Sequence, residues 1–127
     1  MVFRDKKLVH EDLTYKIIGC AFEVHKELGP GFLESAYEAA MKIELKADNL
    51  EVISQKQFPL IYKGVKIKDF FCDLVVEDKV IVELKAISRI TDIERAQLLN
   101  YLKVTGIKVG LIINFGQTSL KHVRMVL

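Results

Sequence analysis

The stretch FFCDLVVEDKVIVELKAI, residues 70–87, decides the fold. Two runs of β-branched and aromatic residues flank the polar triplet 77–79, which predicts two strands joined by a three-residue loop. The second run is apolar enough for a central strand, yet it contains Glu83 and Lys85. Burying a carboxylate and an ammonium is costly unless each has a partner or a task. The stretch therefore predicts a sheet with a polar site in it.

The spacing of these charges predicts how they meet. Strand periodicity places Glu83 and Lys85 on one face, and a loop centred on Asp78 makes Asp73 the antiparallel partner of Glu83. Two carboxylates at that distance repel each other and raise the pKa of one or both, unless a cation lies between them. Oxygen ligands suit magnesium or manganese. Lys85 could orient or deprotonate a metal-bound water, or neutralise charge on a phosphate.

A plainer interpretation of the same charges exists. Glu83 and Lys85 could form an ordinary ion pair near the end of the sheet, with Asp73 terminating a strand. For either charge alone this interpretation is the better one. The convergence of three charges through independent periodicity arguments favours a site.

The remaining elements follow from periodicity and turn residues. Apolar residues at helical spacing predict three helices, over 11–28, 33–47 and 91–105, the last capped by Thr91 or Asp92. The run from Glu51, with a turn at Lys63-Gly64, supplies one more strand, so that three strands form a meander. Residues 108–115 predict a central strand covered on both faces. Residues 121–127 fit an edge strand or a short helix, and the whole order requires an α/β mixed sheet with helices packed on it.

Composition limits the classes of function. At 127 residues, 50% hydrophobic and 28% charged, the chain is expected to form a single domain, 1–127. A net charge of +2 is too balanced for binding nucleic acid by charge alone, so any such contact must be local. The first twelve residues lack the apolar core of a signal peptide and no later segment approaches a membrane span, which predicts a cytoplasmic protein. Cys20 and Cys72, in no metal-binding or CxxC pattern, are expected to be reduced and buried.

Several further polar residues are candidates for the site, although each also has a structural explanation. Gln97 and Tyr101 lie one helical turn apart and share a face, as boundary residues of an amphipathic helix also do. Glu34 lies in the first turn of the second helix, where the helix dipole and capping favour a carboxylate. His25 complements the dipole at the end of the first helix, and a role as ligand or base is its lesser alternative.

These residues together resemble a known superfamily. Asp73, followed by Glu83-Leu84-Lys85 on the next strand of an αβββαβ order, is similar to the PD-(D/E)xK nucleases. Gln97 and Tyr101 resemble the QxxxY motif of the exonuclease-related branch, and residues 31–37, GFLESAY, resemble the signature of the small GxxExxY proteins. The resemblance extends roughly over residues 17–115. It implies a restriction-endonuclease-like αβββαβ core with an extra N-terminal helix.

The resemblance also implies roles for the candidate residues. Asp73, Glu83 and the backbone carbonyl of Leu84 would bind Mg²⁺ or Mn²⁺, and Lys85 would position the attacking water or stabilise the transition state. Glu34 would hold a metal-bound water, and Gln97 with Tyr101 would contact the site or a phosphate. The chain departs from the pattern at Cys72, which replaces a loosely kept proline.

The implied function is that of a magnesium-dependent phosphodiesterase acting on DNA, with RNA as the second choice. So small a chain leaves no room for a recognition domain, so specificity is expected to be low or supplied by a partner protein or a homodimer, which could act on branched DNA. The alternative is a non-catalytic nucleic-acid-binding or protein-binding module that retains the fold. The intact Asp73, Glu83 and Lys85 count against that alternative.

Overall fold

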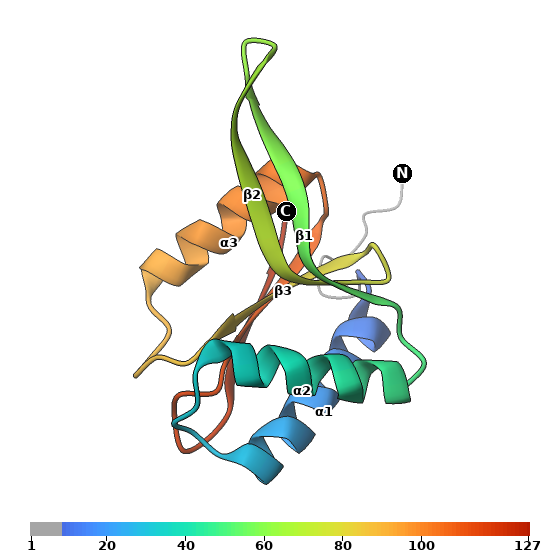
Figure 1. The fold of residues 1–127 in the computed structure, drawn as a ribbon, viewed down its shortest axis with the longest axis vertical. Coiled ribbons are helices and arrows are strands. Elements are labelled where there is room, and N and C mark those ends of the chain that lie inside the picture. Colours follow the sequence, from blue (N-terminus) through green and yellow to red (C-terminus); the bar gives the residue numbers. More distant parts are fainter. Residues whose placement is uncertain (1–8) are drawn as a thin grey trace, which may run out of the picture.

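The structure, a computed structural model, describes residues 9–127 as a five-stranded mixed sheet with three helices (Figure 1). The elements are α1 (Glu11–Leu28), α2 (Glu34–Ala47), β1 (Val52–Tyr62), β2 (Val65–Val76), β3 (Val80–Lys85), α3 (Asp92–Thr105), β4 (Val109–Asn114) and β5 (Lys121–Val126). The predicted order with its extra N-terminal helix is confirmed. Of the alternatives for the last segment, the edge strand is correct. The first eight residues, on which most of the signal-peptide prediction rests, lie outside the described residues.

The strands lie in sequence order across the sheet. β1, β2 and β3 form the predicted antiparallel meander, and Val76 pairs with Val80, so the turn is centred on Asp78. β3 and β4 pair in parallel, which requires a crossover, and α3 supplies it. β4 is buried along its whole length, as predicted for a central strand covered on both faces.

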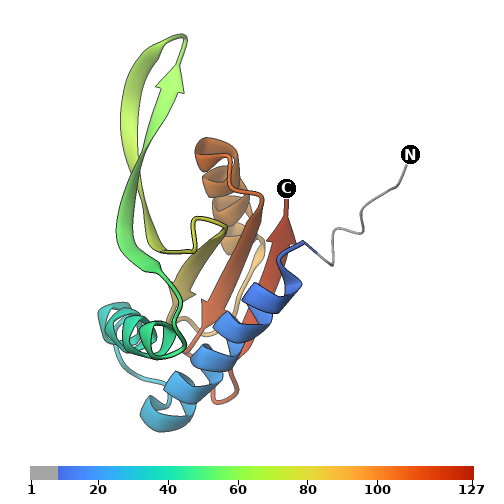
Figure 2. The same cartoon turned by 90° about the vertical axis from the view of Figure 1, so that its right-hand side faces the viewer.

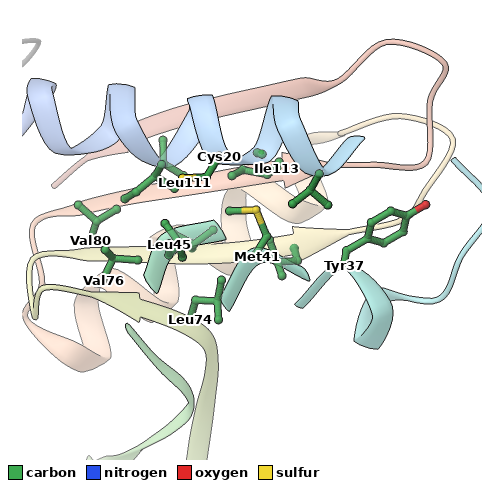
Figure 3. Close-up of a cluster of buried hydrophobic side chains, with 14 of the residues drawn as sticks. Cys20, Tyr37, Met41, Leu45, Leu74, Val76, Val80, Leu111 and Ile113 are labelled. Carbon is green, nitrogen blue, oxygen red and sulfur yellow. The ribbon is translucent and has the colours of Figure 1, made fainter. Parts of the chain in front are cut away.

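Helices cover both faces of the sheet, with α1 and α2 on one side and α3 on the other (Figure 2). Figure 3 shows the larger core, in which Met41 and Leu45 of α2 pack against inward residues of the strands. In β3, alternation sends Val82 into this core and Ile81 into the smaller core beneath α3. The cysteines are free and buried, as expected. No helix within residues 9–127 is long and apolar enough to cross a membrane.

The outer ends of β1 and β2 rise above the rest of the sheet as a two-stranded arm (Figure 1). We define the hairpin arm as residues 56–72, because the pairing of β2 with β3 begins only at Leu74. The arm is anchored to α3, where the rings of Phe70 and Tyr101 meet edge to face with centroids 5.4 Å apart. The arm is therefore held by α3 as well as by its own strand pairing.

A buried amide connects the end of β4 to the loop that follows β3. The side chain of Asn114 accepts hydrogen bonds from the N–H groups of Ile87 (3.0 Å) and Gly116 (3.1 Å), and donates to the Ile87 carbonyl (2.9 Å). Asn114 is fully buried, so water cannot replace these partners. The amide thus fixes the chain just beyond Lys85.

Asn114→Ala is expected to destabilise the fold by about 3 kcal/mol, because it removes a buried amide and leaves the partly buried backbone groups of Ile87 without partners. Urea unfolding followed by circular dichroism measures the free energy of unfolding. The matched control is Thr118→Ala, an exposed position nearby, for which a change within about 0.5 kcal/mol is expected. A similarly small change for Asn114→Ala would show that the amide is not a structural link.

Candidate active site

Asp73 lies where β2 separates from β3. The pairing Leu74–Val82 continues in register to place Asp73 opposite Glu83, but the ladder ends at Leu74. The Asp73 carboxylate accepts the backbone N–H of Leu84 at 2.8 Å. The carboxylate thereby accepts from a backbone N–H of β3 that has no backbone partner in β2. This hydrogen bond holds the Asp73 side chain beside Leu84.

Glu83 is a buried carboxyl with one unsatisfied oxygen. Its exposed fraction is 5%, and its Oε1 atom has no hydrogen-bond partner among the described residues. Burial and then the nearby Asp73 carboxylate raise the pKa of Glu83 to about 8, against a smaller opposing effect of Lys85. A buried oxygen without a partner is costly, so this site calls for a proton or a cation.

The amino group of Lys85 forms a hydrogen bond with a side chain of α3. Its Nζ atom donates to Oε1 of Gln97 at 3.3 Å, and Lys85 makes no ion pair within residues 9–127. The plainer interpretation, an ordinary Glu83–Lys85 ion pair, is therefore not what the structure shows. Tyr101, one turn further along α3, packs against Phe70 of the hairpin arm. Burial, followed by the charge of Glu83, raises the pKa of Tyr101.

Glu34 shares a cavity with Asp73. The cavity has a volume of about 200 Å³ and is lined by Glu34, Ser35, Glu38, Gln55, Asp73 and Leu84. The first three come from the start of α2, so this helix supplies one wall and the strands supply the other. Glu34 is exposed at the mouth, as befits a residue in the first turn of a helix.

Tyr37 explains how the start of α2 is held. Its hydroxyl donates to the carbonyl of Gly29 at 2.6 Å and accepts the N–H of Phe32 at 3.2 Å. Its buried ring stacks on Phe115 with centroids 4.5 Å apart. Gly31 has a φ of 112°, which residues with a side chain rarely adopt. This glycine and tyrosine shape the loop that delivers Glu34 to the cavity.

His25 has a structural role in this arrangement. Its ring Nε2 is 2.8 Å from the carbonyl oxygen of Gln117, and the residue is buried outside the cavity. It joins α1 to the loop after β4. The lesser alternative, a metal ligand or base, receives no support from this geometry.

Three residues that line the cavity were not predicted as site residues, namely Ser35, Glu38 and Gln55. Gln55 lies opposite Asp73 in β1 and donates to Oε1 of Glu38 at 2.7 Å and, more weakly, to Oδ1 of Asp73 at 3.4 Å. Its φ of 52° is unusual for a strand and carries a cost of about 1–3 kcal/mol. Glu38 follows Glu34 by four residues, a helical spacing that could have indicated a shared face. No local signal marks Gln55.

The donor set suits a hard divalent cation. The unsatisfied oxygen of buried Glu83, beside Asp73, fits a metal site, and all the predicted donors are oxygen atoms. Over residues 9–127 no cluster of three or more His, Cys, Asp or Glu side chains could hold a metal. The protein would therefore supply two carboxylates and the Leu84 carbonyl, and water would fill the remaining positions, as is usual for Mg²⁺.

Fold and site together define a class of protein. A mixed sheet with an aspartate on one strand and Glu-x-Lys on the next, flanked by helices on both faces, is the restriction-endonuclease-like arrangement. A family model described as the PD-(D/E)XK nuclease superfamily matches residues 11–126, and the chain belongs to that superfamily. The superfamily membership predicted from the sequence is thus confirmed.

A solved structure shares the fold. The crystal structure of SSO0001 is similar with a TM-score of 0.59 and 12% sequence identity, over 99% of this chain and 69% of that chain. No curated protein matches the chain. At this identity the structural likeness shows the fold alone.

Proposed function

We propose that the protein is a metal-dependent nuclease that hydrolyses phosphodiester bonds of DNA, with Mg²⁺ or Mn²⁺ as its cofactor. The observation that carries this proposal is the unsatisfied oxygen of Glu83, buried beside Asp73 at the strand end that also bears Lys85. This combination is costly in a protein that binds nothing there. Membership of a nuclease superfamily supports the same conclusion.

The residues of the site have separable roles in this proposal. Asp73, Glu83 and the Leu84 carbonyl would hold the metal ion, which when bound activates water and neutralises charge on the phosphate. The Lys85 amino group, without an acidic partner and directed by Gln97, orients the attacking water or stabilises the phosphoryl oxygens. Glu34 would hold a metal-bound water. Tyr101 packs on Phe70 of the hairpin arm, and together with Gln97 it would contact the site or a phosphate.

The finer family assignment is also part of the proposal. We assign the chain to the GxxExxY proteins because Gly31, Glu34 and Tyr37 act together at the start of α2. We assign Gln97 and Tyr101 to the QxxxY motif because Gln97 contacts Lys85. In both cases, the contacts give the motif residues a function in positioning the site.

A panel of single-stranded, duplex and branched DNA and RNA, with Mg²⁺, Mn²⁺ or EDTA, tests the proposed activity. We expect metal-dependent cleavage of DNA. Sedimentation with branched DNA checks whether a homodimer presents two sites. Failure to cleave any substrate with either metal, in a folded protein, would replace the proposal with the non-catalytic binding module.

Divalent metal is expected to stabilise the native state, because the unfolded chain binds it poorly. At a Mn²⁺ concentration 100 times its dissociation constant, the gain is about 2.7 kcal/mol, or several degrees in melting temperature. Asp73→Asn should remove most of this gain, since it removes a ligand and its charge. The control is Asp92→Asn, at a fully exposed side chain in α3, which should keep it. Equal gains for wild type and Asp73→Asn would contradict the ligand assignment.

A further inference from the structure

The hairpin arm has a higher net positive charge than the chain as a whole. Residues 56–72 contain four lysines, at 56, 63, 66 and 68, and one acidic residue, Asp69, for a net charge of +3. The whole chain carries only +2, so the rest of the molecule has a net charge of −1. With so balanced a net charge, any contact with nucleic acid must be local, and the arm is where positive charge is concentrated.

The outer part of the arm also exposes large apolar side chains among the lysines. More than half of the surface of each of four residues faces solvent: Ile61, Tyr62, Val65 and Ile67. Lys63 lies over the Tyr62 ring at 5.5 Å and Lys68 over the Phe70 ring at 5.8 Å, and neither forms an ion pair within residues 9–127. Exposed apolar surface of this kind is typical of binding sites rather than of free surface.

The base of the arm is part of the candidate active site. Gln55 and Asp73 line the cavity directly below it, and Lys56 pairs with Asp78 at 3.0 Å across the base. From Gln55 to the tip at Tyr62, the strand extends about 23 Å. A long ligand bound along the arm would therefore reach the proposed site of cleavage at its base (Figure 1).

The shape and charge of the arm favour one partner. A two-stranded ribbon fits the major groove of B-form DNA, which is about 12 Å wide, and the lysines complement the phosphates on its rims. The major groove of duplex RNA is too deep and narrow to admit it. Association of two copies through their arms would bring two charges of +3 together, which disfavours that alternative.

We propose that the hairpin arm binds the major groove of duplex DNA and directs the enzyme to duplex in preference to single-stranded DNA and to duplex RNA. This inference rests on the proposed nuclease function and names its substrate class. The exposed lysines bind phosphates, while the apolar residues between them contact base edges such as thymine methyl groups. The apolar residues make no hydrogen bonds to base edges, so the sequence preference of the ribbon is weak.

The test is a charge reversal on the arm, Lys63→Glu/Lys66→Glu/Lys68→Glu. Fluorescence anisotropy with a DNA duplex of about 30 base pairs, in EDTA and at several NaCl concentrations, measures the dissociation constant and its salt dependence. We expect affinity to fall on the order of 100-fold and the slope of log K against log salt to lose about 3. The matched control is Lys16→Glu/Lys26→Glu/Lys121→Glu, on α1 and β5 at the far edge of the sheet, for which a loss within about threefold is expected.

A second variant guards against loss of folding. Lys63→Gln/Lys66→Gln/Lys68→Gln removes charge without reversing it and should give an intermediate loss of affinity with an unchanged circular dichroism spectrum. Wild-type affinity in both arm variants would overturn the proposal, as would equal losses in the arm and control variants. A wild type that binds duplex RNA as tightly as duplex DNA would also overturn it. So would unchanged DNA affinity together with a sedimentation change confined to the arm variants, which would identify the arm as a contact between copies.

Cleavage assays separate this inference from the nuclease proposal. A wild type that cleaves DNA, with arm variants that bind and cleave equally well, would overturn the arm alone. A wild type that binds duplex DNA through the arm but cleaves no substrate would overturn the nuclease proposal and support the arm.

Discussion

Lys85→Ala is expected to lose cleavage by a factor of about 10² to 10⁴ while it keeps its metal-dependent stabilisation. The amino group forms no ion pair within residues 9–127 and donates a hydrogen bond to the Gln97 amide. Its charge is therefore available for the substrate. Removing a group that acts only in the transition state lowers kcat without a matching change in binding.

Three measurements on Lys85→Ala distinguish a chemical role from a structural one. Cleavage with Mg²⁺ should fall, duplex binding in EDTA should remain within a few-fold, and the Mn²⁺-induced rise in melting temperature should match that of the wild type. Stability should change by no more than about 1 kcal/mol, since a side chain with one long hydrogen bond contributes little to folding. Lys79→Ala, an exposed lysine in the turn before the same strand, serves as the matched control.

If Lys85→Ala unfolds at ordinary temperature and the wild type cleaves nothing, Lys85 is a structural residue. The protein would then be a binding module on a nuclease fold.

Gln97→Ala is expected to have a smaller effect, a loss of cleavage of about 10-fold. Gln97 touches Lys85 and orients it, so it is a positioning residue. The pH profile of the remaining activity distinguishes loss of this orienting contact from general loosening of α3. Only loss of the contact changes the surroundings of the Lys85 amino group, so only that loss is expected to alter the pH profile. The conservative change Gln97→Asn shortens the side chain and should not restore the activity. An unchanged rate and pH profile for Gln97→Ala would remove Gln97 from the site.

Much of the fold was predictable because local sequence signals, such as turn lengths and helix caps, agree with the tertiary structure. The turn centred on Asp78 sets the register of β2 and β3, and an odd loop length with strand periodicity determines which residues meet. The capping box of Thr91 and Glu94 marks the start of α3, and Gly106 marks its end. Signals of this kind depend on neighbouring residues only, so a sequence displays them.

The parts of the site that depend on tertiary geometry were not predictable. The sequence does not show that β2 pairs with β3 only from Leu74 onward, so no local signal indicated the hydrogen bond from the Leu84 N–H to the Asp73 carboxylate. Gln55 adopts a left-handed conformation within a strand, against its local preference. The buried amide of Asn114 looks like the polar end of a strand in sequence and acquires its role only when the β3 loop packs on it.

Glu83→Gln is expected to stabilise the metal-free protein at alkaline pH, by on the order of 4 kcal/mol at about pH 9. Burial first, and then Asp73, raise the pKa of this carboxyl from 4.5 to about 8 in the folded state. The folded protein therefore holds the proton more tightly than the unfolded chain does. The stabilising effect is complete below pH 4.5, is lost progressively as pH rises towards 8, and is absent above that value.

Glutamine resembles the protonated carboxyl and carries no charge at any pH, so the variant avoids this loss. The difference in free energy of unfolding between Glu83→Gln and wild type, measured by urea unfolding in EDTA, should grow from pH 5 to pH 8 and then level off. Comparison with Glu27→Gln, an exposed position in α1, removes the contributions of other titrating groups. Adding Mn²⁺ should narrow the difference in stability, because the cation compensates the charge of the buried Glu83 carboxylate, a charge that glutamine does not carry. Parallel stability curves for wild type and Glu83→Gln between pH 5 and pH 9 would mean that Glu83 is not a buried, unsatisfied carboxylate, and the central argument for a metal site would fail.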